Sequence, residues 1–203
     1  MRSLYQKIKL NACFFLYVAI AKRLPCSYAR WGGPIYMKIR RVLARPLLAG
    51  CGEGVNVETG ADFGRGNKVW LGKFSDLGVN CEIHGEVRIG DHTFMGPGVA
   101  IWTTNHAFDR TDVPIMYQGD QPERPVFIGD DVWIGTRAII LPGVQVGNHV
   151  IIGAGSVVTK NIPDWAIAAG NPAKIIKYRL HDAEKVFIPT DTSTRGTITN
   201  LWE

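Results

Sequence analysis

The chain has 203 residues, 46% of them hydrophobic, and a net charge of +5 with a pI near 9.1. This length fits one domain with appendages, and the four cysteines, which show no C-x-x-C spacing, exclude a disulfide scaffold and indicate a reducing compartment. The positive charge favours an anionic partner, whether nucleic acid, a phosphorylated cofactor or an acidic membrane surface.

The N-terminal segment begins with basic residues and continues with an apolar run from residue 10 to 21. Such a beginning is found in secretion signals, but the charged sequence "AKRLPCSYAR" that follows offers no small-residue cleavage site. The run is also shorter than the roughly 20 apolar residues that a bilayer-spanning helix needs. We therefore expect a helix that lies on another surface.

A second helical pattern begins at Pro34. One side of it is apolar, with Ile35, Ile39, Val42 and Leu43, and another side carries a basic stripe of Lys38, Arg41 and Arg45. Two interpretations stay open. The helix caps the core and leaves its basic face in solvent, or residues 1–48 attach the protein to anionic lipid headgroups.

An aliphatic residue recurs at every sixth position on both sides of a long interruption. The next residue is often Gly, and the fourth residue after each aliphatic is small or β-branched. The aliphatic positions are Leu71, Leu77, Ile83, Ile89, Met95 and Ile101, then Ile128, Ile134, Ile140, Val146, Ile152 and Val158. A period of six is typical of short strands joined by tight turns, three strands to a coil of about 18 residues. An irregular first coil around Val57, Ala61 and Phe63 precedes the regular part, so the sequence predicts an all-β solenoid of about five coils.

The interruption breaks this count, because Ile101 and Ile128 are 27 positions apart. A solenoid accepts insertions at its corners, so we expect residues 102–127 to form an extended loop. Long loops without structure of their own are uncommon in compact domains and are often functional.

The hexapeptide register, the loop sequence "NHAFD" and the run from "VFIGDDVWIG" to "GNPAKII" resemble the hexapeptide-repeat O-acetyltransferases, near the maltose, galactoside and nodulation-factor enzymes and those of exopolysaccharide clusters. The resemblance covers residues 51–179 and leaves 1–50 outside. It implies a left-handed parallel β-helix over 51–170, a homotrimer with active sites between subunits, and acetyl-CoA as cosubstrate without a metal. We expect an N-terminal helical extension over 1–50 and a C-terminal helix and tail over 171–203.

Acetyl transfer to a hydroxyl needs a base, and histidine suits this role at neutral pH. His106 lies in the loop and matches the catalytic histidine of the family, whereas His84, His92, His149 and His181 are expected at outward or turn positions or in the C-terminal helix. For the acceptor, the resemblance implies Asn80 and Trp133, and Asn105 and Asp109 lie beside His106. For the cosubstrate, the expected contacts are Gly135, Thr136, Ala154, Thr159, Lys160, Lys174 and Lys177, with the backbone N–H of Gly135 or Thr136 as oxyanion donor.

Several of these residues have plain structural alternatives. Asn80 would suit a turn before Cys81, Trp133 would suit a subunit interface, and the lysines would suit a solvated surface. Asp109 is a candidate to orient the His106 imidazole, although spacing in a loop does not fix distance.

The sequence leaves two other protein classes open. A γ-type carbonic anhydrase would need His84, His92 and His106 to converge on zinc. A trimeric interaction protein would have the same β-helix without catalytic activity. We favour an acetyltransferase acting on a saccharide by direct transfer, with a cell-surface polysaccharide or lipid-linked glycan as acceptor and without nucleic acid as a partner. The expected location is the cytoplasm, at the inner face of the membrane if residues 1–48 bind it. The polar tail from Pro189 to Glu203 is expected to be mobile or to pack on a neighbour.

Overall fold

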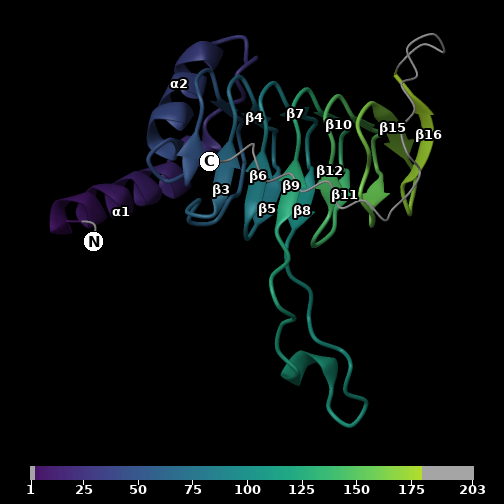
Figure 1. Ribbon diagram of the computed structural model, residues 1–203. Coiled ribbons are helices and arrows are strands. Elements are labelled where there is room, and N and C mark those ends of the chain that lie inside the picture. The colour runs from purple at the N-terminus through teal and green to yellow at the C-terminus, as the bar shows by residue number, and fades with distance from the viewer. Residues whose placement is uncertain (1–2, 180–203) are drawn as a thin grey trace.

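The computed structural model describes residues 3–179 and consists of a triangular prism of short parallel strands with two helices at one end (Figure 1). The helices are α1 (Leu4–Ala19) and α2 (Gly33–Ala44), with short 3₁₀ turns at Ala21–Arg23 and Ile115–Tyr117. The strands are β1 (Gly50–Cys51), β2 (Asn56–Val57), β3 (Val69–Leu71), β4 (Asp76–Leu77), β5 (Glu82–His84), β6 (Val87–Ile89), β7 (Phe94–Met95), β8 (Ala100–Trp102), β9 (Val126–Ile128), β10 (Trp133–Ile134), β11 (Ile139–Ile140), β12 (Gln145–Val146), β13 (Ile151–Ile152), β14 (Val157–Val158), β15 (Ala166–Ala169) and β16 (Lys174–Tyr178).

The strands form three faces, which the chain visits in turn. The first face is β1-β3-β6-β9-β12, the second is β7-β10-β13-β15-β16 preceded by the pair β2-β4, and the third is β5-β8-β11-β14. Within the prism each strand pairs in parallel with strands of the neighbouring coils, as in the register Ile134 to Ile152. The predicted left-handed β-helix is confirmed.

The prism interior is filled by the residues of the six-residue repeat. All twelve aliphatic repeat positions are buried, and so are the small residues four positions later, including Ser75, Cys81 and Thr93. Ser75 and Thr93 donate hydroxyl protons to the carbonyls of Gly90 and Gly129, so the buried polar side chains are paired. Burial of these columns holds each coil on the next.

The predicted C-terminal helix is wrong over its described part, and the rest of it, with His181 and the tail, lies outside the described residues. After Gly170, whose φ is +106°, the chain reverses and β16 pairs antiparallel with β15. The unpaired backbone of an edge strand favours such a cover, and the β-branched Ile175 and Ile176 suit a strand.

The second helix lies where the sequence placed it, but it turns a different side to the prism. Gly33, Arg40 and Ala44 are buried, whereas Ile35 and Val42 are more than 60% exposed. The Arg40 side chain donates to the carbonyls of Leu24, Pro25 and Val57 and pairs with Glu58. These acceptors make the inward face of α2 polar at its centre. Of the predicted apolar side, Leu43 packs against the core, whereas Ile35, Ile39 and Val42 are exposed.

Candidate active site

The loop between β8 and β9 leaves the prism at the edge where the third face meets the first (Figure 1). Its two arms run antiparallel at the base, where the N–H groups of Ala107, Gln121 and Arg124 donate to the carbonyls of Gly119, Asn105 and Thr103. Thr103 is buried, and its hydroxyl donates to the His84 carbonyl and Glu123. The base of the loop is therefore tied to the prism, while the rest projects away from it.

His106 lies on this paired stem, and its side chain is 79% exposed. Its Nδ1 is 2.9 Å from Oδ1 of Asp120, on the returning arm. A carboxylate at Nδ1 holds the ring in the tautomer that leaves Nε2 free to accept a proton. Within residues 3–179 the carboxylate that contacts the His106 ring is that of Asp120, and no contact joins Asp109 to His106. Sequence spacing could not identify Asp120, because the contact depends on how the two arms of the loop pair.

A second group of predicted residues lines the edge where the second face meets the third. The turns at 78–81, 96–99, 135–138 and 153–156 stack there, joined by bonds such as Gly155 N–H to the Thr136 carbonyl at 2.8 Å. This stack brings Asn80, Gly135, Thr136 and Ala154 onto one edge. Lys174 of β16 pairs with Ala169 of β15 and lies at the end of the same edge, with Lys177 further along β16.

The backbone of this edge offers unused donors. Within residues 3–179 the N–H groups of Thr136 and Ala154 donate to no protein acceptor, whereas that of Gly135 donates to the Ile152 carbonyl at 2.7 Å. The stacked turns therefore present amide donors to a ligand lying along the edge. Of the two predicted oxyanion donors, only Thr136 has its N–H available.

Asn80 is exposed and adopts a φ of +52°, in the left-handed region that asparagine tolerates well. The turn role expected for it is thus present in the structure. Trp133 is 48% exposed on the second face and stacks on Phe94, with ring centroids 5.9 Å apart. Both residues are open to a ligand or a second subunit.

Thr159 and Lys160 do not join this group. They follow β14 and lie at the edge from which the loop leaves, on the other side of the third face. Both are exposed, and no carboxylate of the described chain pairs with Lys160, Lys174 or Lys177. One chain therefore presents its candidate residues on two separate edges.

The other histidines of the described chain serve different contacts. His84 stacks on Trp102 and His92 stacks on Phe74, with centroids 4.1 and 5.3 Å apart. His149 stacks on Trp165 and its Nδ1 lies 2.9 Å from Asp131. Across residues 3–179 no three His, Cys, Asp or Glu side chains converge as metal ligands would.

Asp76, in the strand before the Asn80 turn, is a largely buried carboxyl whose Oδ1 accepts the Met95 N–H at 2.9 Å. Burial raises its pKa from 3.8 to about 6, against the opposing effect of that hydrogen bond. The unfolded chain therefore ionises first, and the folded protein loses stability as the pH rises from about 4 to about 6.

We expect Asp76→Asn to stabilise the protein by about 2 kcal/mol above pH 6 and to have little effect below pH 4. The amide keeps the acceptor for Met95 and removes the buried charge. Urea unfolding of both proteins at the two pH values measures the difference. An equal difference at both values would contradict the assignment.

A prism of hexapeptide coils with a projecting histidine loop defines the class of hexapeptide-repeat transferases, and the comparisons agree. The family model "Bacterial transferase hexapeptide (six repeats)" matches residues 125–160. The galactoside O-acetyltransferase of Escherichia coli (strain K12) is 31% identical over 167 residues, which make up 81% of this chain and 80% of that protein. The chain thus belongs to the hexapeptide-repeat O-acetyltransferase family, and it is an acyltransferase.

Two solved structures are similar along most of their length. A galactoside acetyltransferase in complex with coenzyme A has a TM-score of 0.68 and 26% identity, covering 91% of this chain and 87% of that one. A maltose O-acetyltransferase from Clostridium difficile 630 has a TM-score of 0.64 and 29% identity, covering 87% of this chain and 89% of that one.

Proposed function

We propose that this protein transfers the acetyl group of acetyl-CoA to a hydroxyl of a saccharide, either a cell-surface polysaccharide or a lipid-linked glycan intermediate. The observation that carries the proposal is the oriented His106 imidazole on a loop that the prism holds at its base. Relatives that bind coenzyme A or are named for O-acetylation of galactosides and maltose support the donor and the reaction type.

In the proposed reaction, Nε2 of His106 takes the proton of the acceptor hydroxyl while the hydroxyl oxygen forms a bond to the thioester carbonyl carbon. The Thr136 N–H donates to the resulting oxyanion. The carbon–sulfur bond then breaks, the thiolate of coenzyme A takes the proton from His106, and the acetyl ester leaves. Transfer is direct, without an acyl-enzyme. Asp120 stabilises the imidazolium that forms between the two proton transfers.

The split of the candidate residues between two edges supports a homotrimer. His106 projects from the third–first edge, whereas Asn80, Thr136 and Ala154 lie along the second–third edge of the same chain. A cyclic arrangement would place the loop of one subunit against the second–third edge of the next and so complete three sites. In this arrangement Trp133 and Phe94 line the cleft, and the lysines of β16 meet the phosphates of coenzyme A.

Thiol release from acetyl-CoA, measured across a panel of mono- and oligosaccharides, tests the function. We expect release that depends on a sugar and a product that carries an acetyl ester on one hydroxyl. Sugar-independent release, or none with any acceptor, would contradict the proposal. Metal analysis of the same preparation separates it from the carbonic anhydrase alternative, which requires stoichiometric zinc.

Asp120→Asn is expected to lower kcat by about tenfold or more and to leave the KM for acetyl-CoA unchanged, because the residue acts only through the His106 ring. Asp120→Glu should restore part of the rate, since it returns the carboxylate. The matched control is Asp109→Asn in the same loop, which should retain the wild-type kcat. If the two Asn variants lose activity equally, Asp120 has no special orienting role.

A further inference from the structure

The N-terminal extension differs in charge from the rest of the molecule. Residues 1–50 contain ten of the 23 Lys and Arg residues and none of the 18 Asp and Glu residues, so in the remainder acidic residues outnumber basic ones. Within the described chain no carboxylate pairs with Lys7, Lys9, Lys38, Arg41 or Arg45. One end of the prism thus carries concentrated positive charge, most of which the carboxylates of residues 3–179 leave unpaired.

The first helix has two apolar faces. Leu10, Phe14 and Tyr17, spaced i, i+4 and i+7, turn inward, and the Tyr17 hydroxyl donates to the Ala61 carbonyl at 2.8 Å. Leu4, Ile8 and Phe15 lie on the opposite side and are 75%, 60% and 69% exposed. A helix that only capped the core would need the first face and not the second.

Lysines border this outward face of α1. At 3.6 residues per turn, Lys7 falls along one margin of the Leu4, Ile8 and Phe15 face and Lys9 along the other. Both lysines are exposed. Their long side chains can keep the ammonium groups at a polar boundary while the apolar residues between them enter an apolar medium. This distribution is typical of helices that lie in the surface of a bilayer.

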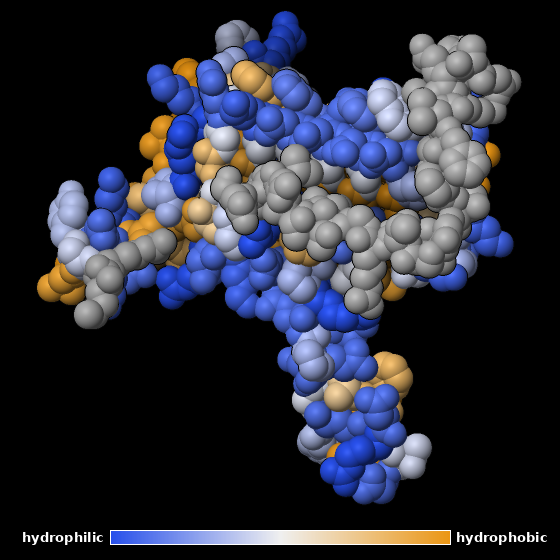
Figure 2. Space-filling model, in the orientation of Figure 1, coloured by the Kyte–Doolittle hydropathy of each residue, from blue (hydrophilic) through white to orange (hydrophobic). Residues whose placement is uncertain are grey.

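The second helix repeats the pattern. Ile35, Ile39 and Val42 form an exposed apolar stripe beside the exposed Lys38 and Arg45. Trp31, just before this helix, is 79% exposed, and tryptophan is enriched at membrane–water interfaces. Figure 2 shows hydrophobic residues on the surface at this end of the molecule, whereas the prism in the same view is mainly hydrophilic.

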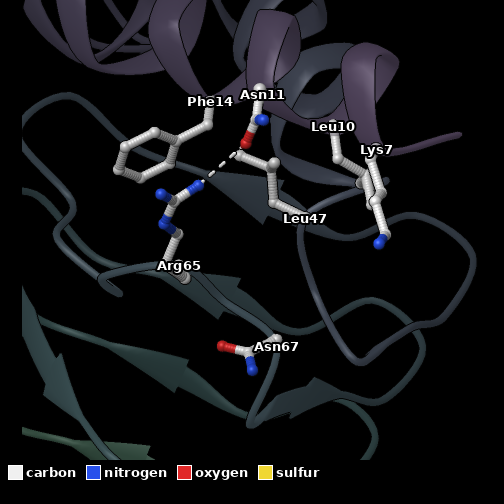
Figure 3. Close-up of a pocket in the computed structure, with 7 residues that line it drawn as sticks. All are labelled: Lys7, Leu10, Asn11, Phe14, Leu47, Arg65 and Asn67. Carbon is white, nitrogen blue, oxygen red and sulfur yellow. Dashed lines mark hydrogen bonds between the residues drawn. The ribbon is translucent and has the colours of Figure 1, made fainter. Parts of the chain in front are cut away.

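A pocket of about 490 Å³ lies at the Lys7 margin of α1, between this helix and the first coil. Leu10, Phe14 and Leu47 line it together with Lys7 and Arg65, which extend into the space from the helix and from a prism loop (Figure 3). The Arg65 guanidinium is held by Asn11 Oδ1 at 3.0 Å and by the Phe14 ring at 4.7 Å. Two cations above apolar walls suit the phosphate and the adjoining chain of a lipid.

We propose that this end of the molecule is a docking surface for an anionic phospholipid bilayer. The outward face of α1 enters the acyl boundary, Lys7 and Lys9 meet the headgroups, and the pocket beside Lys7 receives one lipid phosphate. The proposal rests on the proposed function only in that such a membrane would present a lipid-linked acceptor to the enzyme. It involves residues outside the acetyl-transfer site.

Vesicle co-sedimentation of the full-length protein tests this surface without either substrate, so its outcome is independent of the acetyltransferase assay. We expect binding to vesicles of phosphatidylcholine with phosphatidylglycerol, weak binding to phosphatidylcholine alone, and a decline with rising salt. Lys7→Glu should lower partitioning about tenfold, and Phe15→Ser by a similar factor.

The matched control is Lys73→Glu, which makes the same charge change at an exposed site on the prism. It should bind as the wild type does, and thermal melts establish that all variants are folded. Equal binding to both vesicle types, or equal loss in Lys7→Glu and Lys73→Glu, overturns the proposal. A wild-type protein that binds no vesicles also overturns the proposal. If Phe15→Ser in addition lowers the oligomeric state, the outward face is covered by a second copy.

Discussion

His106→Ala lowers kcat by about 10² to 10⁴ and leaves the KM for acetyl-CoA close to the wild-type value, if the imidazole is the general base. The reason lies in the geometry of the loop stem. Asp120 holds Nδ1 at 2.9 Å, so Nε2 is the atom left to take the hydroxyl proton, and alanine offers no group in its place. Steady-state thiol release with a saturating acceptor measures the effect.

His92→Asn is the matched control for this experiment. His92 is also exposed, but it stacks on Phe74 at a different edge of the prism. Its φ is +55°, which asparagine tolerates, so the substitution should not strain the backbone. We expect wild-type kcat for His92→Asn. A His106→Ala protein with unchanged kcat would remove His106 from the proposed mechanism.

Mixed trimers extend the experiment to the arrangement of subunits. His106→Ala and Asn80→Ala each disable one edge of the chain, and each homotrimer should be nearly inactive. When the two are unfolded and refolded together, random pairing restores a complete site at about a quarter of the interfaces, provided that the edges come from different subunits. No recovery, although mass measurements show mixed trimers, would place both residues in one subunit's site.

The prism could be predicted from the sequence because a repeat encodes the same local structure each time it recurs. Each hexapeptide specifies one strand and one turn, so Ile134 and Ile152 stack because both obey the same local rule. The two edges that carry the candidate residues follow from that register. For the same reason, His106 was predicted to stand outside the prism, since it lies in the segment that breaks the period.

The contacts that the sequence could not predict are those made by segments outside the six-residue repeat. Asp120 reaches His106 because the loop folds back on itself, and β16 pairs with β15 because an open edge is available. Arg40 is the sharpest case. Charge patterning places an arginine on the surface, and only the three-dimensional structure brings the carbonyls of Pro25 and Val57 and the carboxylate of Glu58 around it.

Arg40→Met is expected to destabilise the protein by about 3 to 5 kcal/mol. The Arg40 side chain is fully buried, and that of Glu58, whose carboxylate lies 3.2 Å away, is only 7% exposed. Methionine would fill much of the space but would leave the carboxylate without its cation and the carbonyls of Leu24, Pro25 and Val57 without this donor; of the three contacts, the one to Val57 is buried. Urea unfolding measures the change, and Arg45→Met, at an exposed position one turn and a residue further on, is the control with little expected effect.

A second substitution, at Glu58, shows which unpaired group causes the loss of stability in Arg40→Met. The Glu58 carboxylate also accepts hydrogen bonds from Ser27 and Asn56; burial tends to raise its pKa, but these bonds and Arg40 bring the net pKa below the ordinary value. If an uncompensated charge causes most of the loss, Arg40→Met with Glu58→Gln should be more stable than Arg40→Met alone, because glutamine keeps the acceptor without the charge. Equal stability of the two variants would instead assign the loss to the unpaired carbonyls. In either case Arg40 joins the helical extension to the first coil, through its contacts with Val57 and Glu58.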